Sequence, residues 1–380
     1  VVTQLAMGIT VLIARYLGEK REDQIGSIIG GGTVVFAAIS LVLFVIMVGF
    51  ARPIAVLMQA PEEAVELTAA YIRICGAGIF FIVAYNVLSA IFRGLGDSNS
   101  PLLFVFVACI VNVVGDLVLV AGLGMDAMGA ALATVFAQAL SVVFAIVRLV
   151  KKGLPFTITG YDFRWNPQCG KFLQIGLPLA LQECLTQGSF LALCAFVNRL
   201  GLEASSGYGV ACKIVNFAML IPSALMQSTS SFVSQNVGAG EQKRAKKTMF
   251  TGIGIGLLVG CFAFSLVFFR GDLLAGIFSA DAAVVQRGYE YLKGFAPETL
   301  LTAVLFSMMG YFNGNGKTVW VMLQGLIQTL LVRLPFAYYM SIQTDASLTN
   351  IGLAAPISTA VGIVLNVAFF LYLEHAAKRS

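Results

Sequence analysis

The 380-residue chain is 58% hydrophobic and only 11% charged, and its mean hydropathy is +0.89. Soluble domains carry about a quarter charged residues, so this composition excludes an ordinary soluble protein and predicts a chain embedded in the lipid bilayer. The formal net charge of +5 arises from loops between apolar stretches. It therefore does not predict a nucleic-acid partner.

Apolar windows of about 20 residues, the length that crosses a bilayer as a helix, follow one another along the chain. No window alternates as a strand does, and backbone groups in lipid must pair within their own segment, so we predict an all-α polytopic membrane protein. Residues 1–16 look like part of a further helix. Complete spans are predicted near 25–50, 67–92, 101–122, 128–150, 170–199, 207–235, 245–269, 288–312, 318–340 and 351–373.

An internal repeat pairs residues that stand 220 positions apart, such as Tyr71 with Tyr291 and Phe92 with Phe312. One gap-free offset covers the span from Gly18 to Gly96. The repeat predicts two six-helix bundles related by a pseudo-two-fold axis along the membrane normal. Two-fold repeats in an apolar chain are typical of secondary transporters, with the solute site where the halves meet.

The repeat also divides the chain. Residues 1–150 are predicted to form an N-terminal lobe with helices 2 to 6, residues 151–169 a cytoplasmic linker, and residues 170–380 a C-terminal lobe with helices 7 to 12. Because Val1 aligns with Ile221, inside the second helix of the C-terminal half, the chain is expected to lack the first helix and part of the second of a twelve-helix protein.

Lys and Arg gather in alternate loops, which sets the predicted orientation. By the positive-inside rule the basic loops and the C-terminus are cytoplasmic. An even number of helices separates equivalent loops, so both halves have the same orientation. The basic segments are 17–24, 93–100, 148–170, 238–247 and the C-terminal end.

Enzymatic chemistry finds little support in the residues. The seven cysteines are scattered, and the single histidine, His375, lies at the chain end, so neither a metal cluster nor a Ser/His triad is predicted. The glycine-rich loops at 92–101 and 312–318 lack the GxxxxGK[ST] pattern that cradles ATP phosphates. We therefore predict no catalytic residues, no cofactor and no enzyme.

Ionisable residues within the apolar windows are the candidates for function, because a charge at mid-membrane costs at least about 2.5 kcal/mol. Asp116 follows Asn112 by one helical turn on the same face. Glu183 and Glu298 lie near the middle of their predicted spans. The basic counterparts are Lys213 and Arg333.

These residues can have structural roles as well as functional ones. Asp116 can cap or bridge helices, and Glu183 and Glu298 can pair with Lys213 or Arg333 simply to hold the bundle together. Alternatively, a carboxylate in this setting can bind Na⁺ or carry a proton. Proline residues inside the predicted spans are either passive kinks or hinges for alternating access; they are Pro222, Pro297, Pro335 and Pro356.

Several motifs together resemble the multidrug and toxic compound extrusion (MATE) family, and the chain is most similar to its bacterial MepA-like and DinF-like branch. The resemblance implies a twelve-helix efflux pump, a monomer of the bacterial inner membrane, that exports organic cations in exchange for H⁺ or Na⁺. The motifs are YIRICG (71–76), FRGLGDSNSP (92–101), NVVGD (112–116), MGAALATVFAQ (128–138), IGLPLALQE (175–183), SFVSQNVGAGEQKRA (231–245) and GYFNGNGKT (310–318).

The resemblance also implies roles for individual residues. Asn112, Asp116 and Thr134 match the family's N-lobe cation site, which holds Na⁺ or a proton and draws a further Asp from the first helix. Glu298 matches an acidic position that serves coupling or drug binding in related pumps. Glu183, Lys213 and Arg333 are expected to contribute to the same C-lobe site. In the mechanism implied, ion binding at Asp116 repacks the N-lobe and releases the drug.

Two other functions are conceivable for an apolar chain of this kind. A lipid or lipid-linked oligosaccharide flippase of the same superfamily needs a cationic cavity for phosphate, whereas the mid-membrane bases here are only Lys213 and Arg333, against three acids. An intramembrane prenyl transferase needs aspartate-rich, Mg²⁺-binding motifs, and no DxxxD or DDxxD run occurs. Cation-coupled drug export is therefore the prediction, with the flippase as the alternative.

Overall fold

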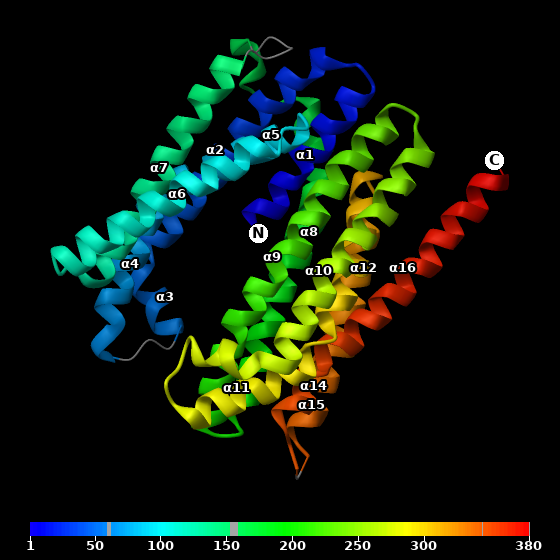
Figure 1. Cartoon of the computed structure of the whole chain (residues 1–380). Helices are drawn as coiled ribbons and strands as arrows, with labels where there is room; N and C mark the ends of the chain where they lie inside the picture. Colours follow the sequence, from blue (N-terminus) through cyan, green and yellow to red (C-terminus); the bar gives the residue numbers. More distant parts are fainter. Residues whose placement is uncertain (59–61, 153–158, 344, 380) are drawn as a thin grey trace. The chain divides into compact units, whose positions relative to one another are not determined.

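A computed structural model describes residues 1–58, 62–152, 159–343 and 345–379, and the regular structure in these residues is entirely helical (Figure 1). Eight helices among them are long and apolar enough to span a membrane, and two pairs of shorter helices qualify as bent spans. The all-α polytopic fold predicted from the sequence is confirmed. The chain forms two compact units, Val2–Gly176 and Leu177–Ser380, which we call the N-lobe and the C-lobe.

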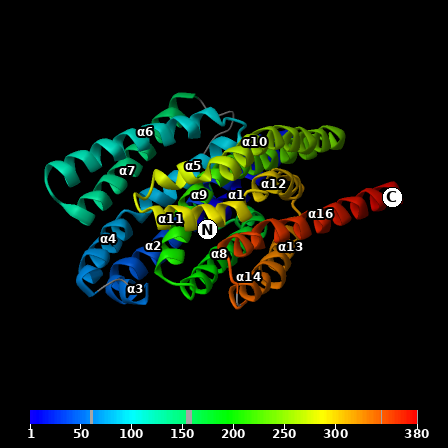
Figure 2. The same cartoon turned by 60° about the horizontal axis from the view of Figure 1, so that its bottom comes forward.

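The N-lobe is a bundle in which α6 and α7 run side by side (Figures 1 and 2). A π-helical turn, η3 (Leu117–Gly122), continues α6 directly after Asp116. The helices are α1 (Val2–Gly18), α2 (Ile25–Gly49), α3 (Ala51–Leu57), α4 (Val65–Ala77), α5 (Ile79–Gly94), α6 (Asn99–Asp116), α7 (Asp126–Lys152) and the start of α8 (Pro167–Asn198), with short turns η1 (Glu22–Gln24), η2 (Glu62–Ala64) and η4 (Gly160–Asp162).

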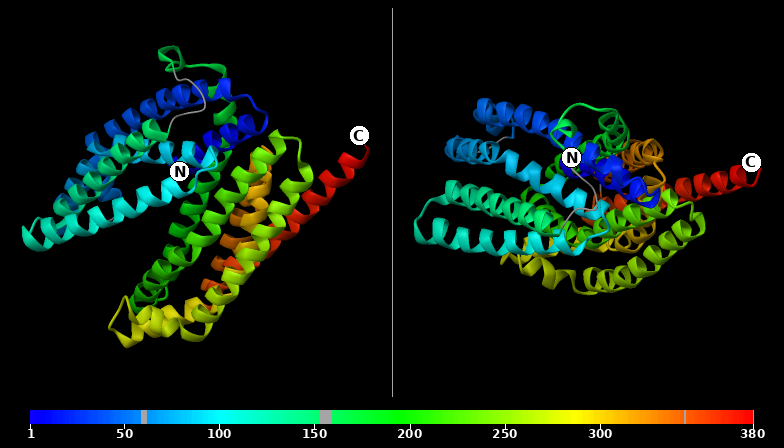
Figure 3. Two further views of the ribbon diagram at one scale, coloured as in Figure 1. Left: turned by 45° about the horizontal axis from the view of Figure 1, so that its top comes forward. Right: turned by 90° about the horizontal axis from the view of Figure 1, so that it is seen from above.

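In the C-lobe α9, α10 and α12 pack against one another along their length (Figure 3). A second π-helical turn, η5 (Ile327–Arg333), joins α13 to α14. The helices after α8 are α9 (Leu202–Gly238), α10 (Gln242–Gly276), α11 (Ala282–Phe295), α12 (Glu298–Gly314), α13 (Thr318–Leu326), α14 (Leu334–Ser341), α15 (Leu348–Gly352) and α16 (Ala354–Arg379).

The outward faces of the long helices are apolar. On α10, Leu258 is 76% exposed and Phe262 is 71% exposed. A soluble protein rarely exposes contiguous apolar surface of this kind. Because α10 is also 35 residues long with a window hydropathy of 2.3, these side chains face lipid.

Small residues let helices approach closely inside each lobe, as is usual in membrane bundles. A Cβ atom on Gly8 of α1 would overlap the carbonyl oxygen of Phe172 in α8, and one on Gly294 of α11 would overlap the carbonyl oxygen of Thr349 in α15. Glycine is therefore required at both contacts. Each lobe is therefore held together by close contacts between helix backbones as well as by side-chain packing.

Two predicted spans, 67–92 and 288–312, are not straight. The first bends by 50° between α4 and α5, at Gly78, and the second bends by 48° between α11 and α12, at Ala296 and Pro297. Pro297 has no N–H for the helical ladder. As a result Glu298, predicted near the middle of a continuous span, is instead the first residue of α12, directly after the bend.

The described end of the linker folds back onto the N-lobe. The Asp162 carboxylate accepts hydrogen bonds from the Thr159 backbone N–H at 2.8 Å and from the Ser27 hydroxyl at 2.7 Å. These bonds lower the pKa of Asp162 below its usual range, because they stabilise the ionised form. Residues 153–158 lie outside the described residues.

Candidate functional site

Two of the predicted N-lobe residues, Asn112 and Thr134, come together where α6 and α7 approach closely. A Cβ atom on Gly115 would lie 2.8 Å from the Cβ of Ala133, so the two backbones are in near contact at this level. The approach lets the Asn112 side-chain amide donate a hydrogen bond to the Thr134 hydroxyl at 3.3 Å. Thr134 in turn donates to the carbonyl oxygen of Ala130, one turn earlier in α7, at 3.0 Å.

Asp116 lies one helical turn beyond Asn112 and is the last residue of α6. Its Oδ1 atom is buried and accepts no hydrogen bond. Among the described residues Asp116 also forms no ion pair. A buried carboxylate oxygen without a partner costs free energy, on the order of 1–3 kcal/mol or more for a charged group, so this position is open to a ligand that would satisfy it.

The N-lobe cluster offers only oxygen ligands: the Asp116 carboxylate, the carbonyl of the Asn112 amide and the Thr134 hydroxyl. Oxygen sets of this kind suit hard cations rather than soft metals, and a desolvated carboxylate can alternatively take a proton. No group of three or more His, Cys, Asp or Glu side chains that could hold a metal ion occurs in the part of the chain that the structure describes.

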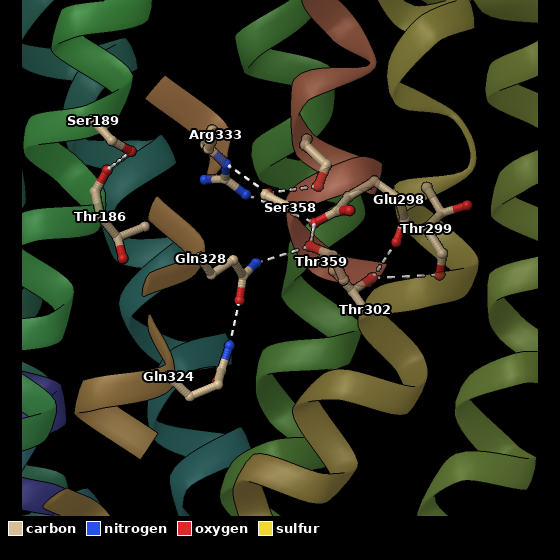
Figure 4. Close-up of polar contacts among 11 residues, drawn as sticks. Thr186, Ser189, Glu298, Thr299, Thr302, Gln324, Gln328, Arg333, Ser358 and Thr359 are labelled. Atoms are coloured by element: carbon tan, nitrogen blue, oxygen red, sulfur yellow. Dashed lines mark hydrogen bonds and ion pairs between the residues drawn. The ribbon is translucent and has the colours of Figure 1, made fainter. Parts of the chain in front are cut away.

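The C-lobe holds a different arrangement around Glu298 (Figure 4). Glu298 is 3% exposed and Arg333 is 7% exposed. Oε1 of Glu298 accepts a hydrogen bond from the Thr359 hydroxyl at 2.8 Å and lies 3.9 Å from Nη2 of Arg333. Two of the predicted C-lobe residues therefore form a buried ion pair, with a threonine of α16 as the third member.

Two glutamines extend this cluster into a chain of hydrogen bonds. Gln324 donates to Oε1 of Gln328 at 2.6 Å, and Gln328 donates to the Thr359 hydroxyl at 3.0 Å. Both glutamines are buried. The chain runs from α13 through η5 to α16 and ends at the Glu298 carboxylate (Figure 4).

Arg333 is held from two further sides. Its Nε donates to the Ser358 hydroxyl at 3.4 Å, and its guanidinium carbon lies 5.4 Å from the ring centroid of Phe190 in α8. A cation over an aromatic face gains electrostatic attraction, and more so when desolvated. The Arg333 guanidinium is thus fixed among α8, α12 and α16.

The structure does not bring the remaining predicted C-lobe residues to this cluster. Glu183 accepts a hydrogen bond from Gln187, one turn along α8, at 2.8 Å. Lys213 is exposed, and its ammonium nitrogen lies 5.5 Å from the ring centroid of Phe278. Within the described residues neither side chain contacts Glu298 or Arg333, so an ion pair of Glu183 or Glu298 with Lys213 is ruled out there.

The polar chain of the C-lobe was not predicted, although part of it left a signal in the sequence. Gln324 and Gln328 are four residues apart in an otherwise apolar window, which places them on one helix face. Thr359 gave no such signal, because an isolated threonine in a membrane helix usually bonds to its own backbone. Its role follows only from the packing of α16 against η5.

Comparison with known proteins identifies relatives. The model of the MatE family matches residues 1–118 and 178–339. The chain is 27% identical to the probable multidrug resistance protein YpnP of Bacillus subtilis, over 75% of this chain and 64% of that protein. It is 26% identical to the multidrug export protein MepA of Staphylococcus aureus, over 84% of this chain and 72% of that protein. The chain thus spans less than two thirds of YpnP.

Solved structures show the same fold. An outward-facing multidrug resistance MATE family transporter of the MOP superfamily superimposes with a TM-score of 0.94 at 21% identity, covering 100% of this chain and 85% of that one. A MOP superfamily transporter from Pyrococcus furiosus, described as having a binding pocket of reverse polarity, gives 0.91 at 22% identity, with 100% and 85% covered.

Proposed function

The chain belongs to the MatE family, and from this premise we propose that it is a secondary active antiporter that exports organic cations or drugs in exchange for Na⁺ or H⁺. Relatives that are named for multidrug resistance or multidrug export support the drug-like cargo. The family match and the apolar spans make the chain a polytopic membrane protein of a transporter family. The coupling ion, cargo and residues below are the proposal.

One observation carries the coupling part of the proposal: the buried, unpartnered Oδ1 of Asp116 beside the Asn112–Thr134 hydrogen bond. A charged carboxylate without a partner inside a membrane-spanning helix is unfavourable until it binds a cation or a proton. Asn112 and Thr134 add neutral oxygen ligands without adding charge. We assign these three residues to the coupling-ion site.

Coupling requires that the ion and the drug prefer opposite conformations, because a ligand that binds two states equally shifts nothing. The π-helical turn η3 begins directly after Asp116. Turns of this kind recur at functional sites, since their looser hydrogen-bond ladder can rearrange. Ion binding at Asp116 would then change the ladder of α6 and η3 and favour the state that releases the drug.

The basic loops support an orientation in the bacterial inner membrane with the linker and the C-terminus in the cytoplasm. An organic cation then leaves the cytoplasm against its gradient, driven by Na⁺ or H⁺ entry. A monomer suffices for this cycle, because each chain carries both lobes.

Export can be measured in proteoliposomes that contain the full-length protein and a fluorescent organic cation, under an imposed Na⁺ or H⁺ gradient. We expect gradient-driven transport that Asp116→Asn abolishes and that Asn112→Ala and Thr134→Ala weaken. The matched control is Asp126→Asn, the same change at an exposed position of the same lobe. Transport that survives in Asp116→Asn, or that needs neither gradient, contradicts the proposal.

A further inference from the structure

Glu298 is a deeply buried carboxylate, whereas Asp116 is half-buried, and the coupling scheme above does not use Glu298. Its side chain is 4% exposed and that of Arg333 is 9% exposed. Such a pair is neutral as a unit, although each member alone would be a costly charge in a membrane bundle. The contacts that hold the Arg333 guanidinium beside Glu298 therefore determine whether this carboxylate can bind another cation or a proton.

The Arg333 guanidinium favours the ionised form of Glu298, and the direction of the hydrogen bonds is consistent with that form. Gln328 can only donate from Nε2, so the Thr359 oxygen must accept that bond, and the single proton of Thr359 is then donated to Oε1 of Glu298. Oε1 is consequently an acceptor. Arg333 stays charged in any protein environment and supplies the opposite charge.

The π-helical turn explains why Arg333 reaches this position. In an α-helix two residues five apart point about 140° away from each other around the axis. Gln328 and Arg333 are five apart, yet they contact the adjacent residues Thr359 and Ser358 on α16. The i→i+5 closure of η5 brings both onto one face.

Pro335 provides the local cause of the wide turn. It is the second residue of α14 and follows η5 directly. A proline lacks the N–H of the ladder, and its ring clashes with the carbonyl four residues earlier, here Leu331. Widening the turn before Pro335 moves that carbonyl away. Pro335 is exposed, so it shapes the turn without packing in the core.

We propose that η5 makes Arg333 a fixed internal counter-ion of Glu298, so that the C-lobe carboxylate stays ionised without a mobile cation, although its Oε2 has no hydrogen-bond partner. Arg333 is here a positioning residue that occupies the place of a mobile ion. Among the described residues, Tyr291 of α11 is a further titratable group beside the pair, and its ring meets that of Tyr208 of α9 edge to face, with 5.0 Å between ring centroids. The consequence that coupling falls to the N-lobe rests on the proposed function.

Infrared difference spectroscopy of the full chain in lipid nanodiscs tests the inference, because a protonated carboxylic acid has a carbonyl band that a carboxylate lacks. Near neutral pH the wild-type spectrum minus that of Glu298→Gln should contain no such band. Arg333→Met should gain one, and the double variant Glu298→Gln/Arg333→Met should lose it again. A Glu298 band in the wild type, or none in Arg333→Met, overturns the proposal.

The part played by the turn has its own variant. Pro335→Ala restores the N–H and removes the ring clash, so the turn can close as an α-helix and rotate Arg333 away; a partial Glu298 band is expected. Pro53→Ala, at an exposed proline of α3 in the N-lobe, is the control and should leave the spectrum unchanged. A wild-type spectrum for Pro335→Ala overturns the role of η5.

If Arg333→Met does not fold, melting of the double variant decides. Recovery of the midpoint temperature in the neutral double variant supports the paired charges, whereas additive losses contradict them. None of these measurements involves transport. Failure here therefore leaves the N-lobe coupling site untouched, and failure of drug export leaves the Glu298 spectrum interpretable.

Discussion

Each lobe has a helix that contains a π-helical turn with a charged residue at that turn, and the two charges are opposite in sign. In the N-lobe Asp116 directly precedes the π-helical turn η3, and in the C-lobe Arg333 is the last residue of the π-helical turn η5. Both acids have a buried oxygen without a hydrogen-bond partner, Oδ1 of Asp116 and Oε2 of Glu298, but among the described residues only Glu298 has a cation beside it, Arg333 at 3.9 Å. The two halves of a repeated fold can thus differ in whether the protein itself supplies a counter-ion to the acid.

The largest expected difference between the two sites is in the stability of their variants. Arg333→Met takes the counter-ion from a buried carboxylate, which must then stay unpaired or take up a proton, and it should lower the free energy of unfolding by about 3–5 kcal/mol. Asp116→Asn removes a charge that has no protein partner, so it should cost little or even stabilise. Denaturation of the purified variants in detergent measures both. Equal losses for the two variants would show that Asp116 is paired as tightly as Arg333.

The two threonines of these clusters should differ in the same sense. Thr359→Ala removes a hydrogen bond to a charged, buried acceptor and should cost about 1.5–3 kcal/mol, whereas Thr134→Ala removes a neutral bond and should cost about 0.5–1.5 kcal/mol. The same denaturation assay separates them. The reverse order would mean that Glu298 is not the ionised acceptor.

Two glycines allow the contrast to be tested by crowding. A Cβ on Gly362 would lie 2.5 Å from Nε2 of Gln324, and one on Gly115 would lie 2.8 Å from the Cβ of Ala133. Overpacking typically costs about 1–3 kcal/mol, so both Ala variants should lose stability. Only Gly115→Ala should also slow drug export per amount of folded protein, because the added methyl group separates Asn112 from Thr134. A greater transport loss in Gly362→Ala would reverse the assignment of the lobes.

The smallest expected effect lies outside the membrane. The pKa of Asp162 is lower in the folded chain than in the unfolded chain, so its contribution to stability is present above the unfolded pKa and is lost as pH falls through the folded pKa. The melting temperatures of the wild type and Asp162→Asn should therefore differ at neutral pH and converge in acid. A difference that persists in acid would point to a packing effect instead.

Much of the architecture could be predicted from composition and repeat alone, because lipid permits few backbone arrangements. The resemblance to the MATE family likewise singled out Asn112, Asp116 and Thr134, and Asn112 and Thr134 are hydrogen-bonded where α6 meets α7. Hydropathy could not reveal the bend at Gly78, since a bent pair of helices is as apolar as a straight span. The bend at Pro297 had a signal in the proline itself, which predicted a kink or a hinge.

The C-lobe cluster was harder to predict for a similar reason. An apolar window does not say which way a polar side chain points, so Glu183 and Lys213 looked equivalent to Glu298 and Arg333. The extra residue in η5 also breaks the regular spacing that would have placed Arg333 with Gln328. The neighbours of Glu298 therefore depend on tertiary packing.

The most direct test of the account compares gradient-driven export by Asp116→Asn with export by the double variant Glu298→Gln/Arg333→Met, in proteoliposomes matched for the amount of folded protein. We predict that the double variant retains export coupled to the ion gradient and that Asp116→Asn loses it. Coupled export by Asp116→Asn, together with its loss in a folded double variant, would contradict the account and place the coupling ion in the C-lobe.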